Sequence, residues 1–261
     1  MKIGNREIGL VVSSLFQKRH YRAARNMLRV YCQPADAFVR YFLGRGRYPA
    51  DIRIHTAAGE LTLTAYSYHD ILTVNEIFCR LDYPADEKDR VIVDFGSNIG
   101  VSAAYFLTAA PHSFAYLFEP LASNVERLRG NLRRFEGRYS VQEIAAGEAD
   151  GQVEFGWEDT GRYGGIGMKT GRYVTVPCRD SNRILEEIIA RHGRIDILKI
   201  DIETLERQVT ERIPADLAGK IGRIYVEYAF SANPLERTHR YRQYGSVAQF
   251  VNRDATNPVS A

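Results

Sequence analysis

The stretch Val91-Ile92-Val93-Asp94-Phe95-Gly96-Ser97-Asn98-Ile99-Gly100 decides the fold of this 261-residue chain. Its first three residues are a short, continuously apolar run, which is typical of a strand buried on both faces of a sheet. The strand ends in Asp94, and Gly96 and Gly100 allow the backbone to turn sharply and to approach a ligand. With a helix predicted over residues 102–109, the stretch indicates strand, glycine turn and helix, the repeating unit of an α/β sheet.

Strands and helices continue to alternate after this stretch. Strands are predicted over 114–118, 141–145, 195–200 and 224–228, and helices over 125–135 and 181–192. The second helix has Asp180 or Ser181 as its N-cap and Gly193 just past its end. The succession predicts a doubly wound, mostly parallel sheet, which binds ligands at the carboxyl ends of its strands. The glycine-rich segment 151–178 is predicted to be an irregular or hairpin insertion over that end of the sheet.

The N-terminal part has a different pattern. A helix is predicted over 8–31, with a basic stripe of Lys18, Arg22, Arg25 and Arg29. A short helix over 35–42, a β-hairpin over 51–66 and a helix over 69–80 follow. We therefore divide the chain into a basic helical arm with a hairpin cap (1–66) and a main domain (67–261).

Composition excludes several classes of protein. Hydrophobic residues make up 45% and charged residues 26%, as in ordinary globular proteins. No apolar run is long enough to span a membrane, and the first residues lack a signal-peptide cleavage site. The three cysteines form no C-x-x-C pair, which disfavours a disulfide framework or a cysteine zinc site. We expect a cytoplasmic protein.

Charge is unevenly distributed. Residues 1–50 hold ten Lys/Arg and two acids, a net +8, which leaves −5 for the rest of a chain whose total is +3. The basic arm could be a packed cap over the active site, a peripheral membrane or anionic-glycan contact, or a nucleic-acid contact. No RNA-binding motif accompanies it, so we do not expect a nucleic-acid partner.

The glycine turn points to the kind of cofactor. Asn98 stands where the second glycine of G-x-G-x-x-G would be, and the Lys-Ser/Thr pair of a P-loop is missing. Tight binding of a pyrophosphate is therefore not supported, and an NAD oxidoreductase is disfavoured. The loop suits a cofactor without phosphates, with Asp94 near an ammonium group.

Carboxylates follow two more strands. Glu119, in Phe118-Glu119-Pro120, lies 25 residues after Asp94, the spacing of an acid that accepts both ribose hydroxyls. Asp201 and Glu203, in Leu198-Lys199-Ile200-Asp201-Ile202-Glu203, can face one cleft if the turn keeps strand-like alternation. Alternatively, Glu203 caps the next helix or pairs with Lys199.

Five segments in the same order resemble the FkbM-type S-adenosylmethionine-dependent methyltransferases. They are VDFGSNIG, FEP with Asn124, Leu128 and Asn131 after it, EIAAGEADG, LKIDIETLE and YVEY, within residues 66–230. The family commonly has KIDxEGxE, and Thr204 here replaces that glycine. The resemblance implies a class I methyltransferase fold, Rossmann-like with a seven-stranded sheet.

The resemblance also implies roles for particular residues. The methionine part of S-adenosylmethionine would contact Asp94, Gly96, Ser97, Asn98 and Gly100, and Glu119 would hold the ribose. Pro120 and Ala145 would border the adenine, and Asp201 would lie beside the transferred methyl group and the acceptor. The acceptor implied is a sugar hydroxyl of a surface glycan or glycosylated metabolite.

A hydroxyl acceptor must lose a proton, so a base is needed. Asp201 and Glu203 are the first candidates, because two close carboxylates raise each other's proton affinity. They could instead bind Mg²⁺. His69 is a second candidate base and His239 a third, and Asp70, Thr73 and Glu76 are candidates for the cofactor's amino-acid end. The alternative functions are methylation of RNA or of another small molecule, and a non-catalytic nucleotide-binding module.

Overall fold

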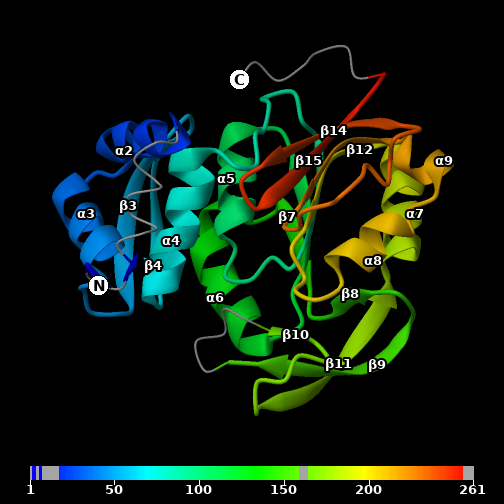
Figure 1. Cartoon of the computed structure of the whole chain (residues 1–261), viewed down its shortest axis with the longest axis horizontal. Coiled ribbons are helices and arrows are strands. Elements are labelled where there is room, and N and C mark those ends of the chain that lie inside the picture. Colours follow the sequence, from blue (N-terminus) through cyan, green and yellow to red (C-terminus); the bar gives the residue numbers. More distant parts are fainter. Residues whose placement is uncertain (1, 4–5, 8–17, 159–163, 255–261) are drawn as a thin grey trace. The chain divides into compact units, whose positions relative to one another are not determined.

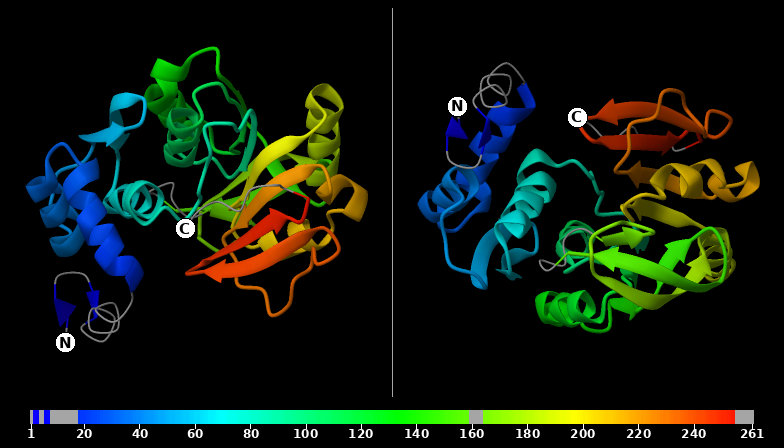
Figure 2. Two further views of the ribbon diagram at one scale, coloured as in Figure 1. Left: turned by 90° about the horizontal axis from the view of Figure 1, so that it is seen from above. Right: turned by 60° about the horizontal axis from the view of Figure 1, so that its bottom comes forward.

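The computed structural model describes residues 2–3, 6–7, 18–158 and 164–254. Its chain divides into two compact units, Met1–Tyr83 and Pro84–Ala261, drawn from three directions in Figures 1 and 2. The boundary follows the predicted helix over 69–80, which belongs to the first unit. No helix among the described residues is both long and apolar enough to cross a membrane.

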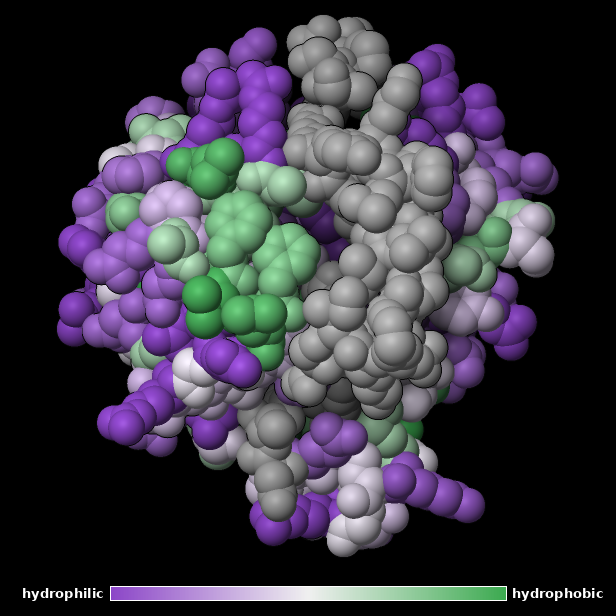
Figure 3. Space-filling model, turned by 60° about the vertical axis from the view of Figure 1, so that its left-hand side comes forward, coloured by the Kyte–Doolittle hydropathy of each residue, from purple (hydrophilic) through white to green (hydrophobic). Residues whose placement is uncertain are grey.

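The first unit is helical around a β-hairpin. Its elements are β1 (Lys2–Ile3), β2 (Arg6–Glu7), α2 (Lys18–Val30), α3 (Pro34–Leu43), β3 (Ala50–Thr56), β4 (Gly59–Ala65), α4 (Tyr68–Val74) and the π-helical segment η1 (Asn75–Arg80). The predicted hairpin is confirmed, and its alternating residues Ile52, Ile54, Leu61 and Leu63 are buried. The predicted start of the first helix, 8–17, lies outside the described residues. Figure 3 shows that this side of the molecule carries a patch of apolar side chains.

The second unit is built on a mixed seven-stranded sheet, as expected. In chain order its strands are β5 (Val91–Phe95), β6 (Phe114–Phe118), β7 (Tyr139–Gln142), β12 (Ile195–Ile200), β13 (Ile221–Val226), β14 (His239–Tyr244) and β15 (Val247–Asn252). Their spatial order is β14-β15-β13-β12-β5-β6-β7. The five strands from β13 to β7 are parallel, and β15 pairs antiparallel with both β13 and β14. The chain winds outward from β5 and then crosses to β12, so the order reverses between these two strands.

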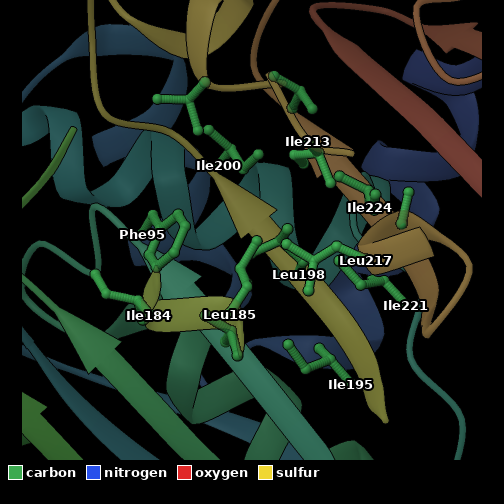
Figure 4. Packing of buried hydrophobic residues seen from close by; sticks show 14 of the residues in the cluster. Phe95, Ile184, Leu185, Ile195, Leu198, Ile200, Ile213, Leu217, Ile221 and Ile224 are labelled. Carbon is green, nitrogen blue, oxygen red and sulfur yellow. The ribbon is translucent and has the colours of Figure 1, made fainter. Parts of the chain in front are cut away.

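Helices cover both faces of this sheet (Figure 1). They are α5 (Val101–Ala109), α6 (Ala122–Leu132) with the 3-10 turn η2 (Arg133–Phe135), α7 (Ser181–His192), α8 (Glu206–Glu211) and α9 (Ala215–Ala218). Alternation along β5 divides its side chains between the faces. Val91, Val93 and Phe95 pack with residues of α7, α8 and α9 in the main core cluster, part of which is drawn in Figure 4. Asp94 points to the opposite face, toward Ser102 of α5.

The predicted insertion forms a second sheet. Its strands are β8 (Ala145–Gly147), β9 (Gly151–Trp157), β10 (Gly164–Ile166) and β11 (Tyr173–Asp180), in the order β10-β9-β11-β8. The strand expected over 141–145 is therefore divided between β7 of the main sheet and β8 of this one. Gly147 lets β8 lie close against β11, because a Cβ at this position would be 2.5 Å from the Cys178 sulfur.

Candidate active site

Four backbone amides of the loop between β5 and α5 donate hydrogen bonds within the chain. The amides of Gly96 and Ser97 both donate to the carbonyl of Phe118 at the end of β6, at 3.0 and 3.1 Å. The amide of Asn98 donates to Glu119, and that of Gly100 donates to the carbonyl of Ser97. A phosphate-binding loop needs such amides directed at its ligand. These hydrogen bonds are compatible with the prediction that this loop does not bind a pyrophosphate tightly.

Gly96 is where the loop meets the neighbouring strand end. Its φ is +79°, and a Cβ there would lie 1.7 Å from the carbonyl oxygen of Asp201. The Asp201 amide in turn donates to the carbonyl of Phe95 at 3.0 Å. The carboxyl ends of β5 and β12 are thus in backbone contact, and only a residue without a side chain fits at this position.

Residues of α6 hold the other end of the loop. The side-chain amide of Asn131 donates to the carbonyl of Ile99 at 2.9 Å. A Cβ on Gly100, whose φ is +84°, would lie 3.1 Å from Leu128 and 3.3 Å from Leu132. Asn131 and Leu128 thus keep this backbone in place, which explains why they accompany the glycine turn in the sequence motif.

Glu119 is a buried carboxylate at the end of β6. One oxygen accepts from the Asn98 amide at 2.9 Å, and the other accepts from the Leu121 amide and the Asn124 side chain at 3.1 and 3.2 Å. Burial raises the pKa of Glu119 to about 7, although these hydrogen bonds and Lys199 act to lower it. The acid therefore joins the loop after β5 to the start of α6, and its charge changes near neutral pH.

Lys199 connects the two strand ends electrostatically. Its ammonium nitrogen lies 3.1 Å from an Asp94 oxygen, 3.1 Å from an Asp201 oxygen and 3.2 Å from the carbonyl of Gly96. Burial lowers the pKa of this lysine, but the carboxylates of Asp201 and Asp94 outweigh burial and raise it above the ordinary value. From the sequence, Lys199 is expected only as a partner of Glu203. The signal available was a lysine between the apolar residues Leu198 and Ile200 of a buried strand, since such residues are buried only when paired.

Asp94 already has partners within the chain. The hydroxyl of Ser102 donates to one oxygen at 2.6 Å, and Lys199 contacts the other. The side chain is completely buried. In this environment Asp94 orders the loop and its lysine, and contact with a cofactor ammonium group stays a prediction.

The turn after β12 adopts an unusual backbone conformation. Glu203 and Thr204 have φ values of +50° and +74°, which are costly for residues other than glycine, and most for a β-branched threonine. The Thr204 hydroxyl donates to the carbonyl of Ile166 in β10 at 3.1 Å. A Cβ on Gly165 would lie 3.0 Å from the Glu203 carbonyl oxygen. The insertion sheet is thus packed directly on the turn that carries the two candidate catalytic carboxylates.

The two acids of this turn differ in their contacts. Asp201 is paired with Lys199, and its side chain is 28% exposed. Glu203 is half-buried beside β10. Glu206, the next acid, is buried at the start of α8, and burial together with the charge of Asp201 raises its pKa.

The adenine-side residues also lie in the second unit. Pro120 is buried directly after Glu119, and Ala145 is buried in β8 of the insertion sheet. Neither has a polar side chain, so their proposed contact with a flat base stays a prediction.

His239 is fixed inside the protein. It is fully buried at the start of β14, where its ring nitrogens contact the Ile221 carbonyl at 3.1 Å and the Thr238 hydroxyl at 2.9 Å. Burial lowers its pKa to about 4. These contacts account for the histidine structurally and give no support to a role as base.

The remaining candidates belong to the first unit and have local contacts there. Asp70 caps α4 by accepting from the amides of Tyr66 and Ser67 at 2.7 and 2.8 Å. Thr73 donates to the carbonyl of His69, and Glu76 pairs with Arg80. Their roles toward cofactor or acceptor stay predictions.

A magnesium site at Asp201 and Glu203 gains no support. Among the described residues, the three donors that lie close enough together to hold a metal ion are Cys32, His55 and Glu60, within 4.8 Å of one another. A thiol and an imidazole suit zinc rather than Mg²⁺. Glu60 moreover lies 3.3 Å from the Arg53 guanidinium. One of these three donors in the first unit is therefore already paired with a cationic side chain.

The part of the chain that holds this site matches a known protein family. The methyltransferase FkbM domain matches residues 94–251. The AMB antimetabolite synthetase AmbE of Pseudomonas aeruginosa is 27% identical over a stretch that covers 66% of this chain and 10% of that protein. This chain thus spans about a tenth of that relative's length.

Two solved structures are distantly similar. A methyltransferase from Geobacter sulfurreducens shares 14% identity, with 64% of this chain and 72% of that chain covered and a TM-score of 0.37. An O-methyltransferase family protein from Burkholderia thailandensis shares 10% identity, with 73% and 57% covered and a TM-score of 0.41. The assignment of fold and family rests on the sheet order and on the domain match.

Proposed function

Because the chain belongs to the FkbM methyltransferase family, we propose that it transfers the methyl group of S-adenosylmethionine to a hydroxyl oxygen of a sugar-containing acceptor. The acceptor class in this proposal is a surface glycan or a glycosylated metabolite. AmbE is named as an antimetabolite synthetase, which is compatible with a metabolite as acceptor and says nothing of a sugar.

The contact between Glu119 and the loop after β5 is the observation that supports S-adenosylmethionine as the cofactor. A buried acid that follows the second strand suits the two hydroxyls of a ribose. The loop beside it has its Gly96, Ser97, Asn98 and Gly100 amides bonded within the chain, as expected for a nucleoside ligand without phosphates. In this proposal Glu119 holds the ribose and the glycine loop contacts the amino-acid part.

Catalysis in this proposal depends on alignment and on one proton transfer. When bound, S-adenosylmethionine supplies an electrophilic methyl group with a neutral leaving group. Asp201 accepts the proton of the acceptor hydroxyl, and Lys199, 3.1 Å away, fixes the position of one carboxylate oxygen. A positioned base contributes about 10²–10⁴-fold to such a reaction. Glu203 is the second candidate for this role.

Support for a sugar acceptor comes from the insertion sheet. The guanidinium of Arg172 lies 5.4 Å from the centre of the Trp157 ring, and Tyr173 is 48% exposed. Aromatic rings and arginines of this kind stack on sugars and bind acidic groups. Arg162 and Tyr163, a further arginine and aromatic residue in the sequence of this insertion, lie outside the described residues. The bond between Thr204 and Ile166 joins this sheet to the turn of Asp201 and Glu203.

Two measurements test the proposal in sequence. A thermal shift with S-adenosylhomocysteine should stabilise the protein, and NAD⁺ at the same concentration should not. Label from methyl-labelled S-adenosylmethionine should then appear on nucleotide sugars or glycan extracts. Stabilisation by NAD⁺ alone would overturn the cofactor assignment. Stabilisation by S-adenosylhomocysteine with no transfer to any hydroxyl would favour the non-catalytic alternative.

A further inference from the structure

Helix α3 of the first unit is apolar on its exposed side as well as on its buried side. Ala37 and Tyr41 are buried, whereas Val39, Phe42 and Leu43 are 42%, 42% and 43% exposed. A soluble surface helix normally places charged residues on its outer side. The apolar outer side of α3 therefore requires an explanation.

The two charged residues of α3 pair with each other. Asp36 and Arg40 are the charged residues within its ten positions, and they pair with each other at 2.6 Å. The guanidinium of Arg40 also lies over the Tyr48 ring, and it donates to the carbonyl of Arg47. These contacts pair Asp36, which is itself exposed at the first turn, with Arg40, and the last turn of the helix, with Phe42 and Leu43, carries no charged side chain.

The exposed apolar side chains are concentrated here. Of the seven large hydrophobic residues that are exposed in the described part of the chain, four lie within residues 28–43: Leu28, at 62%, on α2, and Val39, Phe42 and Leu43 on α3. Figure 3 shows apolar side chains gathered on this side of the molecule among hydrophilic ones. The Phe42 ring stacks on Phe38 at 5.4 Å and meets Tyr41 edge-on, so the patch is ordered before any partner arrives.

Exposed arginines lie close to these residues in the sequence. Arg25 and Arg29 are exposed on α2 beside Leu28, and Arg45 and Arg47 are exposed directly after α3. Within residues 18–50 the one acid is Asp36, which is already paired with Arg40. A second copy of the chain is a poor partner for this patch, because a two-fold contact would bring like charges together. An apolar face bordered by arginines is instead complementary to a bilayer with anionic headgroups.

We propose that the patch of Leu28, Val39, Phe42 and Leu43, with its four arginines, is a peripheral binding site for an anionic lipid surface. The apolar side chains enter the boundary between headgroups and acyl chains, and the arginines contact the headgroups. The sequence left such a contact through the basic first helix open as one of three interpretations of the arm, and this proposal assigns it mainly to α3. It requires no methyl transfer, so it can fail while the proposed enzyme activity holds, and the reverse is also true.

Vesicle sedimentation of the full chain tests the proposal. Large vesicles of phosphatidylcholine with phosphatidylglycerol should bind the protein, and binding should weaken as salt is raised. Vesicles of phosphatidylcholine alone should bind it much more weakly. Replacing Phe42 and Leu43 together by serine should reduce the affinity by more than about tenfold, since each side chain loses its transfer from water. Replacing Arg45 and Arg47 by glutamine should reduce it by about 25-fold, or about fivefold for each charge.

The second unit supplies matched controls. Tyr173 and Val174 are also exposed apolar neighbours, and Arg237 and Arg240 are exposed arginines. Serine at the first pair and glutamine at the second should leave vesicle binding unchanged. The proposal is overturned if the wild type does not bind anionic vesicles, if it binds neutral vesicles equally, or if the control variants lose as much affinity. A wild-type dimer that becomes monomeric on changing Phe42 and Leu43, without vesicle binding, would also overturn it in favour of a second copy.

Discussion

Lys199 and Asp94 are direct neighbours across β12 and β5, and the lysine ammonium lies 3.1 Å from the aspartate carboxylate. The same ammonium lies 3.1 Å from Asp201, the proposed base, which follows β12 by one residue. A structural ion pair inside the sheet and the proposed catalytic carboxylate therefore depend on one cation.

Replacing Lys199 by methionine should strongly destabilise the protein. The change leaves the buried Asp94 carboxylate without its cation, which costs about 3–5 kcal/mol in the free energy of unfolding. Urea unfolding measures this, and the exposed Lys169→Met is the control. A deficit no larger than that of the control would contradict the role assigned to this ion pair.

Replacing Asp201 by asparagine should abolish turnover and leave cofactor binding almost unchanged. We expect a loss of about 10²–10⁴-fold in kcat, because the amide cannot accept the acceptor's proton. Calorimetry with S-adenosylhomocysteine measures the cofactor affinity of the variant. The kcat of Glu203→Gln, measured in the same way as that of Asp201→Asn, shows which of the two acids matters more for turnover. If Asp201→Asn keeps wild-type kcat, the assignment of the base is wrong.

Affinity for S-adenosylhomocysteine should fall as the pH drops below neutral. Burial raises the pKa of Glu119 to about 7, so the fraction of carboxylate that can accept from both ribose hydroxyls decreases as pH falls through that value. Between pH 8 and pH 6 the ionised fraction, and with it the affinity, should fall about tenfold. In Glu119→Gln we expect binding weakened by about 10–100-fold and this pH dependence lost. A wild-type affinity that is constant over this range would show that Glu119 does not hold the ligand as an anion.

Replacing Gly96 by alanine should disrupt the contact between β5 and β12. The new Cβ would lie 1.7 Å from the Asp201 carbonyl oxygen, so the two strand ends must separate. Gly137 provides a matched control, because its φ of +81° is close to the +79° of Gly96 but nothing lies within 4 Å of its Cβ position. Gly137→Ala should cost about 1 kcal/mol, the expense of the left-handed conformation alone. Gly96→Ala should cost clearly more in thermal unfolding, and equal costs would contradict the close contact.

Two substitutions at Thr204 should have different effects. Valine keeps the β-branched side chain at φ +74° and loses the bond to Ile166, so it should destabilise by about 1 kcal/mol. Glycine loses the same bond but relieves the backbone strain, so Thr204→Gly should be about 1–2 kcal/mol more stable than Thr204→Val. Chemical unfolding ranks the two variants. Hydrogen exchange over residues 164–166 should increase in both, and unchanged exchange would show that Thr204 does not hold β10.

Much of the second unit could be predicted from local pattern. The strands over 114–118 and 195–200 and the helix over 181–192 have the predicted bounds, with Asp180 as N-cap and Gly193 in the left-handed conformation after the helix. Burial periodicity, caps and turn residues act over a few neighbouring positions, so a single sequence displays them directly. The match of the FkbM domain confirms the family that the motifs indicated.

The side chains and backbone groups that the polar residues contact could not be predicted from local sequence pattern. Lys199 meets Asp94 across 105 positions of the chain, and Thr204 meets Ile166 across 38. The small residues over 145–147 join the insertion sheet rather than the main one, and His239 lies in the core. Sequence alone determined which residues stand at the strand ends, because alternation and capping are local. Only the tertiary structure decided which of them share a cation, a backbone contact or a hydrogen bond, because those contacts depend on which strands lie side by side.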